Sequence, residues 1–423
     1  MTVAIIGAGP SGLALAKQLL DRDIEFVVYE RDNGIGGVWN ISNAHSVMYE
    51  SAHTISSKTM TEFSEFPMPE TFTDYISHRK MLQYLESYAK KYNLLEHILF
   101  GIEVKNIKEI RDNRYELTLE TGQNKIFHYV AIATGHVSKP NHLKLNIGDF
   151  DGQVLHASTY KEPSIFKNKK VLVIGAGNSG CDIACEAVAL AEQVSLSIRR
   201  GYHFIPKFLL GMPADVFGET SVKLRLPMFL RQIINQGLLR FFQGNIQKIG
   251  FPKPNHRIFE SHPIVNELLI YHVRHGDINI KNDVKAFTSR GVIFFDDSKM
   301  EVDLIICATG YEPDYSFLDD NLIPKMEETH LNLFSKKHAG LSFLGFVDPN
   351  GGVLGLIESQ AIAVAESIAL NLKPDKLLSI MHKNVPLNGG IKYINSERHQ
   401  FEVDHATYRR EINKLISTFK RFS

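Results

Sequence analysis

The 423-residue sequence predicts an α/β protein with two Rossmann-like dinucleotide-binding domains, one of them inserted into the other. A G-x-G-x-x-G run begins at Gly7, and a second run begins at Gly175. Each run stands between a short apolar strand and a helical pattern, and this context makes a glycine motif informative. The length also exceeds the roughly 250–300 residues at which one core stops growing, so two domains are expected.

The first unit extends from residue 3 to residue 30 and combines a strand, a glycine turn, a helix and a strand. In such units the first glycine permits the tight turn, the second lets the backbone approach a pyrophosphate, and the third lets the helix pack on the strand. The N-terminus of the helix points unpaired N–H groups at the phosphates. Glu30, which ends the second strand, can accept hydrogen bonds from a ribose diol, and its charge would repel a 2′-phosphate.

A second glycine pair, Gly36 and Gly37, follows Glu30 and leads to Trp39. NAD binding does not require this pair. It suits flavoproteins, in which the loop after the ribose-binding acid lies along a longer, extended cofactor. We therefore expect FAD at the first site.

The same order of elements repeats around Gly175, with a strand before it, a helix after it and a second strand at 193–201. This strand ends in Arg199 and Arg200, where the first unit has Glu30. Arginines can hold a 2′-phosphate through charge-assisted hydrogen bonds. We therefore expect NADPH at the second site, the alternative being that the two arginines only form a solvated strand end.

Two further apolar strands, in 130–140 and 304–315, each run into Ala-Thr-Gly, which in flavoproteins with two dinucleotide sites marks the passage between domains. We expect an FAD domain at 1–160 and 306–423, and an NADPH domain at 161–305 with a helical insertion at about 211–254. The residues expected to bind FAD are Gly7, Gly9, Ser11, Gly12, Glu30, Arg31, Gly37, Val38, Trp39, Thr134 and Gly135. Those expected to bind NADPH are Gly175, Gly177, Asn178, Ser179, Gly180, Asp182, Arg199, Arg200, Thr309 and Gly310.

Residues 150–160, FDGQVLHASTY, lie between the two glycine motifs and fit the pattern F-x-G-x-x-x-H-x-x-x-Y. The matching residues are Phe150, Gly152, His156 and Tyr160. Together with the segments GNSGCDIA and CATGY, this stretch resembles the flavin-containing monooxygenases. The resemblance extends from Val3 to about Glu366. The related Baeyer–Villiger enzymes usually carry Trp where Tyr160 stands.

The resemblance implies a flavin-dependent monooxygenase of the N,N-dimethylaniline monooxygenase type, which uses NADPH and O2. In that family NADPH reduces FAD, the reduced flavin forms a C4a-hydroperoxide, and an amine nitrogen or sulfide sulfur takes the distal oxygen. The cofactors carry the chemistry, while the protein positions them and excludes water. The alternatives are Baeyer–Villiger oxidation of a ketone, a flavin reductase or oxidase without oxygen transfer, and a redox-sensing partner protein.

Many members of that family place an asparagine beside the flavin, and the corresponding run here is MYESAHTISSKT, with Ile55 at the asparagine position. Isoleucine cannot form that hydrogen bond. No catalytic residue is assigned, and the candidates to act in its place are Ser56, Ser57 and Lys58. His156 is a further candidate, although a hinge or orienting role fits it better.

The amino-acid composition limits the classes of partner and the kinds of site that can be expected. Lys and Arg balance Asp and Glu at 47 each, which argues against nucleic acid. The three cysteines are too few for a disulfide scaffold, and the 18 histidines show no H-x-x-x-H spacing, so no metal site is expected.

The chain begins with a strand in place of a signal peptide and contains no run of 18 apolar residues, so we expect a cytoplasmic protein without a transmembrane anchor. The partners expected are a small-molecule substrate and O2, with a homodimer as an option. The insertion is apolar and basic, and we expect a packed helix pair with a solvated basic face. A lid, an oligomer contact and a membrane-surface helix are the alternatives.

Overall fold

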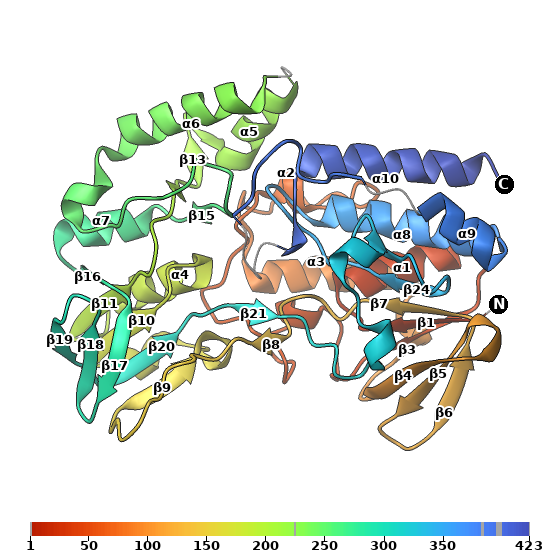
Figure 1. The fold of residues 1–423 in the computed structure, drawn as a ribbon, viewed down its shortest axis with the longest axis horizontal. Coiled ribbons are helices and arrows are strands. Elements are labelled where there is room, and N and C mark those ends of the chain that lie inside the picture. Colours follow the sequence, from red (N-terminus) through yellow and green to blue (C-terminus); the bar gives the residue numbers. More distant parts are fainter. Residues whose placement is uncertain (1, 224–225, 382–384, 395–399, 423) are drawn as a thin grey trace.

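The computed structural model describes residues 2–223, 226–381, 385–394 and 400–422, and these form two lobes side by side (Figure 1). Each lobe contains a largely parallel sheet flanked by helices, which confirms the predicted fold class. Both termini lie on the first lobe.

The first lobe is built on a seven-stranded sheet in which five strands are parallel and two antiparallel strands complete one edge. In sheet order, the strands are β22 (Thr329–His330), β23 (Phe334–Ser335), β24 (Leu341–Phe343), β7 (Tyr129–Ile132), β1 (Val3–Ile6), β2 (Phe26–Tyr29) and β3 (Ile98–Leu99). Strands β1 and β7 are buried along their whole length, as expected for parallel strands covered on both faces.

Helices and a small antiparallel sheet cover the two faces of this sheet. The helices are α1 (Pro10–Leu20), α3 (His78–Lys91), α8 (Leu354–Ala369), α9 (Pro374–Met381) and α10 (His405–Lys420). The small sheet consists of β4 (Val104–Ile110), β5 (Arg114–Leu119) and β6 (Asn124–Phe127). Helix α8 is buried over most of its length because it lies between α1 and α10.

The second lobe is built on a five-stranded parallel sheet. In sheet order, its strands are β16 (Ile278–Lys281), β11 (Gln193–Ser197), β10 (Lys170–Ile174), β20 (Leu304–Cys307) and β9 (Gln153–His156). One face packs against α4 (Asn178–Ala187) and α7 (Leu268–His275), and the other against β17 (Val284–Thr288), β18 (Gly291–Phe294) and β19 (Lys299–Glu301). Strand β9 therefore belongs to the second sheet, although it precedes residue 161, where the sequence suggests that this domain begins.

The two linkers between the lobes pair with each other. Strand β8 (Lys139–Pro140) runs antiparallel to β21 (Tyr311–Glu312), and both lie at the junction in Figure 1. The Thr309 hydroxyl donates to the Asn141 carbonyl at 2.5 Å, next to this strand pair. Each linker directly follows an Ala-Thr-Gly segment, so the two passages between the lobes are joined.

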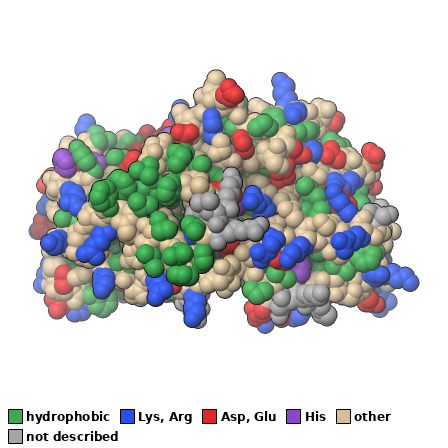
Figure 2. Space-filling model, turned by 90° about the horizontal axis from the view of Figure 1, so that it is seen from above, with side chains coloured by type: hydrophobic (Ala, Val, Ile, Leu, Met, Phe, Trp, Pro, Cys, Tyr) green, Lys and Arg blue, Asp and Glu red, His purple; other side chains and the backbone are tan. Residues whose placement is uncertain are grey.

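The insertion forms a helix pair, α5 (Ala214–Lys223) and α6 (Met228–Gln243), above the second lobe. Two helices in the insertion agree with the expectation, but the exposed face of α6 is mainly apolar where a basic face was expected. Figure 2 shows an apolar patch on this side of the molecule with Lys and Arg around it. The exposed large apolar side chains of α6 are Phe229, Leu230, Ile233, Ile234, Phe241 and Phe242. Within the described part of the chain, no helix is both long enough and apolar enough to cross a membrane.

Candidate functional site

The first glycine turn lies directly against the end of β7. Gly7 has a φ of +106°, and a Cβ added there would lie 2.8 Å from the carbonyl oxygen of Ala133. A Cβ at Gly12 would lie 1.9 Å from the Gly7 carbonyl oxygen, so α1 starts in backbone contact with the turn. The turn thus adjoins Thr134 and Gly135, which follow Ala133 in the first Ala-Thr-Gly segment.

The second glycine turn repeats this arrangement in the second lobe. Gly175 has a φ of +105°, and its added Cβ would lie 2.5 Å from the carbonyl oxygen of Ala308. A Cβ at Gly180 would lie 2.0 Å from the Gly175 carbonyl oxygen. Each Ala-Thr-Gly segment therefore reaches the glycine turn of its own lobe, and Thr309 and Gly310 lie beside the second turn.

Both helices that follow these turns begin without a side-chain cap. The N-cap residues are Gly9 for α1 and Gly177 for α4, and a glycine has no side chain that could accept a hydrogen bond from the helix N-terminus. Uncapped N–H groups and the helix dipole make such a terminus suited to a phosphate. Two buried donors nearby, the Thr134 hydroxyl and the Arg200 Nε, have no hydrogen-bond partner in the described structure. The residues present therefore fit one dinucleotide in each lobe.

Glu30 is 5% exposed and lies beside the first turn. Its Oε2 accepts the Ala8 N–H at 2.6 Å and its Oε1 accepts the Asp32 N–H at 2.9 Å. Burial raises the pKa of Glu30, while these two N–H groups favour its charged form. A carboxylate oxygen has a second lone pair, so Glu30 can still accept hydrogen bonds from a ribose.

The neighbouring glycine loop approaches the first turn through backbone alone. A Cβ at Gly37 would lie 3.2 Å from the Cα of Gly9, so the two segments leave no room for a side chain between them. Ser11 is buried in the first turn of α1, Val38 and Trp39 are half-buried, and Arg31 is exposed. Arg31 thus lies at the surface, unlike the rest of the expected FAD set.

Two polar residues of the set expected to bind NADPH, Asn178 and Asp182, form hydrogen bonds with other segments of the protein. The Asn178 Oδ1 accepts the Val265 N–H at 2.8 Å. The Asp182 carboxylate accepts a hydrogen bond from the Asn266 Nδ2 at 2.6 Å and one from the Tyr49 hydroxyl at 3.3 Å. Burial raises the pKa of Asp182. Tyr49 precedes the second lobe in the chain but packs in the core of that lobe, so Asp182 ties α4 to the segment around residue 49.

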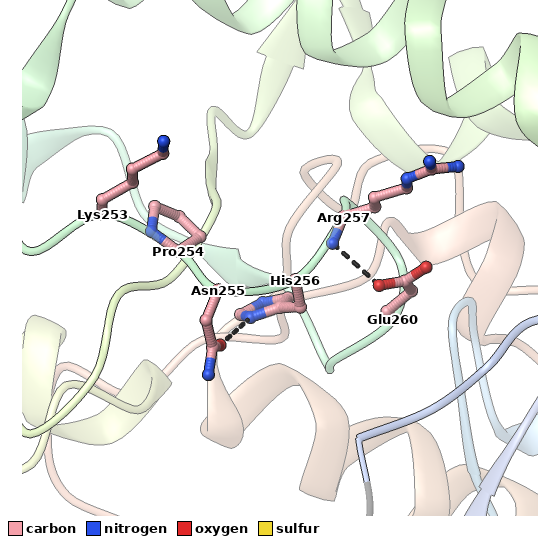
Figure 3. A pocket seen from close by; sticks show the side chains of 6 residues that line it. All are labelled: Lys253, Pro254, Asn255, His256, Arg257 and Glu260. Carbon is pink, nitrogen blue, oxygen red and sulfur yellow. Dashed lines mark hydrogen bonds between the residues drawn. The ribbon is translucent and has the colours of Figure 1, made fainter.

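A hollow of about 550 Å³ is lined by residues between 253 and 260 (Figure 3). Arg199 and Arg200 come two and three residues after β11 ends. Arg199 is exposed, and Arg200 stacks 5.1 Å from the centre of the Tyr202 ring. A Cβ at Gly201 would lie 2.3 Å from the Pro254 nitrogen, so this strand end touches the segment that lines the hollow. The lining residues are Lys253, Pro254, Asn255, His256, Arg257 and Glu260.

Sequence reasoning missed Lys253 and Arg257 as cationic neighbours of this strand end. The basic run KPNHR was visible in the sequence, but nothing local connects it to Arg200, more than fifty positions earlier. The two cations add positive charge at the place where the second site is expected to hold an anion.

His256, which lines this hollow, should make the free energy of unfolding depend on pH. Burial, with smaller contributions from His203 and Arg200, lowers the pKa of His256 to about 4. An unfolded histidine titrates near 6.5, so between these values the unfolded chain binds the proton and the folded chain does not. We therefore expect the free energy of unfolding to fall by roughly 1–3 kcal/mol as the pH is lowered from about 6.5 to about 4.

Urea unfolding of His256→Gln at several pH values tests this prediction. The variant should show a flatter profile between pH 6.5 and 4, whereas a change at the exposed His128 should leave the profile as it is. A His256→Gln profile as steep as that of the wild type would contradict the assignment.

The three candidates near Ile55 are all engaged in contacts within the protein. The Ser56 hydroxyl lies 2.6 Å from that of Thr61. The Lys58 Nζ donates to the carbonyl oxygens of Glu70 and Phe72, at 3.1 and 2.7 Å. The side chain of Ser57, 1% exposed, is hydrogen-bonded to the insertion. Ile55 itself is half-buried.

His156 ends β9 at the junction of the lobes. Its Nδ1 accepts the Ser158 N–H at 3.1 Å, and its ring lies 5.2 Å from that of Tyr311 in the linker strand β21. Burial, and then the neighbouring His142, lowers the pKa of His156. A neutral ring held against a linker agrees with an orienting role.

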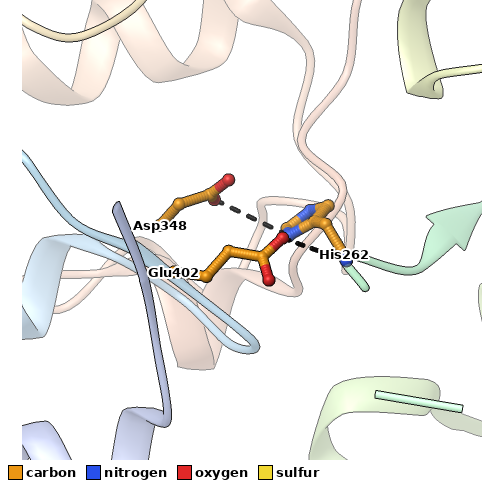
Figure 4. Close-up of side chains that lie close together, drawn as sticks. All are labelled: His262, Asp348 and Glu402. Atoms are coloured by element: carbon orange, nitrogen blue, oxygen red, sulfur yellow. Dashed lines mark hydrogen bonds and ion pairs between the residues drawn. The ribbon is translucent and has the colours of Figure 1, made fainter. Parts of the chain in front are cut away.

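A second group that sequence reasoning did not anticipate joins three chain segments (Figure 4). The His262 Nδ1 lies 3.7 Å from an Asp348 carboxylate oxygen, and the Glu402 Oε1 accepts the His262 N–H at 3.1 Å. One potential metal-binding atom from each lies within 4.8 Å of the others. Asp348 and Glu402 belong to the paired strands β25 (Asp348–Pro349) and β26 (Glu402–Val403), whereas His262 lies in the second lobe. We interpret the cluster as a contact between the lobes.

Comparisons with known proteins agree with these geometries. A family model described as flavin-binding monooxygenase-like matches residues 1–421. The chain belongs to this family. Flavin-containing monooxygenase 5 of Oryctolagus cuniculus is 32% identical to this flavin-binding monooxygenase over 446 residues, which cover 98% of this chain and 82% of that protein.

A second relative is the N-oxide-forming dimethylaniline monooxygenase 2 of Mus musculus, which is 33% identical over 387 residues, or 85% of this chain and 71% of that protein. The solved structure of S-allyl-L-cysteine S-oxygenase from Allium sativum aligns with a TM-score of 0.67 at 18% identity. That alignment covers 100% of this chain and 89% of the other, and it shows a shared fold.

Membership of this family gives the protein its cofactors, FAD and NADPH, and its reaction class, flavin-dependent monooxygenation. Bound FAD supplies the reaction with O2, for which protein side chains have no equivalent. The chain offers two glycine-capped helix N-termini, the buried Glu30 carboxylate and the arginines after β11, and these groups are suited to phosphates and ribose hydroxyls.

Proposed function

We propose that this monooxygenase transfers oxygen to an amine nitrogen or a sulfide sulfur of a small molecule. The name of the N-oxide-forming relative from Mus musculus supports nitrogen as the acceptor. Tyr160 is the sequence feature that favours heteroatom oxidation over Baeyer–Villiger oxidation, because the related Baeyer–Villiger enzymes usually have Trp at this position. The Tyr160 ring is fully buried, stacks 5.2 Å from Phe166, and its hydroxyl donates to Glu186 at 2.6 Å.

We further propose that the first lobe binds FAD and the second binds NADPH, with domain limits near those expected from the sequence and with β9 counted in the NADPH domain. The contrast between Glu30 and the arginines at the end of β11 supports this assignment, because a carboxylate suits a free ribose and a guanidinium suits a 2′-phosphate. The catalytic residues stay unassigned.

A cytoplasmic location and a homodimer are part of the same proposal. The location is supported by Cys181, Cys185 and Cys307, which form no disulfide with one another in the described structure. The apolar face of α6 would suit a second copy of the chain. Light scattering at micromolar concentration, which gives the molar mass, decides between monomer and dimer.

Counting reaction products tests the proposed function and the consequence of Ile55 together. Purified holoenzyme is incubated with NADPH, O2 and a tertiary amine, a sulfide or a cyclic ketone, and NADPH consumption, hydrogen peroxide and oxygenated product are measured. We expect product from the amine or the sulfide, with a substantial share of the NADPH appearing as peroxide. Ile55→Asn should lower that share, because asparagine offers the hydrogen bonds that isoleucine lacks.

Two results would contradict the proposal. Product from the ketone alone would assign Baeyer–Villiger oxidation, and one peroxide per NADPH with every substrate would assign an oxidase. A matched control is Ile147→Asn, since Ile147 is an exposed isoleucine of the linker region. That change should leave the peroxide share as it is.

A further inference from the structure

One side chain of the insertion reaches across to the loop that carries Ile55. The Asp215 Oδ2, in the first turn of α5, accepts the Ser57 N–H at 2.7 Å and the Ser57 hydroxyl at 3.0 Å. The Asp215 Oδ1 accepts the Val216 N–H at 2.9 Å. Ser57 is 1% exposed, so the contact is shielded from water on the side of the loop. Hydrogen bonds to an ionised, partly buried acceptor are among the stronger ones in proteins.

The contact between Ser57 and Asp215 takes the place of a hydrogen bond that would cap the helix that follows Ser57. Ser57 is the N-cap residue of the short helix α2 (Lys58–Thr61), and its side chain makes no capping hydrogen bond to that helix. A serine at this position normally accepts a backbone N–H with its hydroxyl oxygen. Here the hydroxyl donates to Asp215 instead, and the insertion and the loop are joined through one carboxylate.

The loop is in turn fixed to the first lobe. A Cβ at Gly352, just before α8, would lie 1.6 Å from the Met60 carbonyl oxygen, so α2 and the start of α8 are in backbone contact. Just before the insertion, the Lys207 carbonyl accepts the Tyr75 hydroxyl at 2.5 Å and the N–H of Ala214, the first residue of α5, at 2.9 Å. Asp215 therefore lies at a junction whose two sides are each held in place.

Helix α5 is also joined to the first lobe by an ion pair of Glu219, and this ion pair provides a control for Asp215. Glu219 lies four positions after Asp215 and accepts a hydrogen bond at 3.4 Å from Arg409 of α10, whose side chain is 52% exposed. A long ion pair with an exposed partner contributes little. The two acids of α5 thus both reach the first lobe, but only Asp215 contacts the loop that carries Ile55.

We propose that Asp215 is a positioning residue that holds the insertion closed against the Ile55 loop and thereby limits the loss of NADPH to peroxide. The inference rests on the proposed function. In a productive turnover NADPH, a proton, O2 and substrate give NADP⁺, water and the oxygenated substrate. In an unproductive turnover NADPH, a proton and O2 give NADP⁺ and hydrogen peroxide. Access of water to the site favours the second outcome, and a closed insertion restricts that access.

The test compares Asp215→Ala and Asp215→Asn with Glu219→Gln in the FAD-loaded full chain. Hydrogen exchange of peptides that span residues 55–61 reports on the Ser57 N–H and needs no activity. We expect faster exchange and a roughly twofold higher peroxide share for Asp215→Ala, a smaller change for Asp215→Asn, and wild-type values for Glu219→Gln. The KM for NADPH should stay unchanged in all three variants.

Three results would overturn the proposal. Unchanged exchange in Asp215→Ala would show that the contact does not hold the loop, and faster exchange with an unchanged peroxide share would leave it a structural contact only. An equal peroxide share in Asp215→Ala and Glu219→Gln would remove the special role of Asp215. Wild-type protein that makes only peroxide would instead refute the proposed function, while the exchange data would still decide whether Asp215 closes the insertion.

Discussion

Gly175→Ala is expected to lower the rate at which NADPH reduces the flavin by about 100-fold while the protein keeps its FAD. The added Cβ would lie 2.5 Å from the Ala308 carbonyl oxygen, and the φ of +105° is one that alanine rarely adopts. Either the turn or the end of β20 must therefore move. Since the N-terminus of α4 follows this turn, a shift of about 1 Å would misplace the groups that receive the pyrophosphate.

Gly7→Ala makes the same substitution in the first lobe and should weaken the binding of FAD, which Gly175→Ala leaves intact. Its added Cβ would lie 2.8 Å from the Ala133 carbonyl oxygen at nearly the same φ. We expect this variant to be purified largely without FAD, as measured by the ratio of flavin to protein absorbance.

The control for both variants is Gly237→Ala, at an exposed position of α6 where an added Cβ meets no atom within 4 Å. Alanine in a helix interior is favoured over glycine by about 1 kcal/mol, so this variant should be as active as the wild type and slightly more stable. If Gly175→Ala lost FAD, or if Gly7→Ala kept FAD but lost reduction by NADPH, the assignment of cofactors to lobes would be reversed.

Local patterns sufficed to predict the two nucleotide-binding units. A strand, a glycine turn and a helix are each encoded within about 30 residues, and burial of β1 and β10 on both faces makes them continuous apolar runs. The contrast between Glu30 and Arg200 was visible for the same reason, since each lies within three residues of the end of its strand.

The contacts that complete the site join segments far apart in the chain, and sequence periodicity carries no information about them. Strand β9 pairs with β20 because the chain returns after the whole NADPH lobe, and this pairing moves the start of that lobe ahead of residue 161. Asp215 meets Ser57 across 158 positions, and Lys253 reaches the end of β11 through the packing of Pro254 on Gly201. Tertiary packing alone creates these neighbours.

The cationic end of β11 should make the second site selective for NADPH over NADH. Arg200 carries a buried Nε without a partner in the described structure, and Arg199 is exposed beside it. A hydrogen bond to a charged group contributes about 1.5–3 kcal/mol, which corresponds to roughly 10- to 150-fold in affinity. We therefore expect Arg200→Ala to raise the KM for NADPH by about 10-fold or more and that for NADH by less than about threefold, with Arg199→Ala following in the same direction.

The KM values of further variants for NADPH and NADH show which cationic side chains contribute to the binding of the 2′-phosphate. Lys253→Ala and Arg257→Ala should raise the KM for NADPH by smaller factors, because these side chains line the hollow and do not belong to the strand end that is expected to hold the 2′-phosphate. Arg290→Ala removes a 79% exposed side chain from the same lobe and should leave both KM values unchanged. Steady-state rates at low and high salt complete the test, since screening weakens an exposed phosphate contact more than a buried one. Equal increases for NADPH and NADH in Arg200→Ala would show that the arginines hold no 2′-phosphate, and the selectivity would have to come from another part of the second lobe.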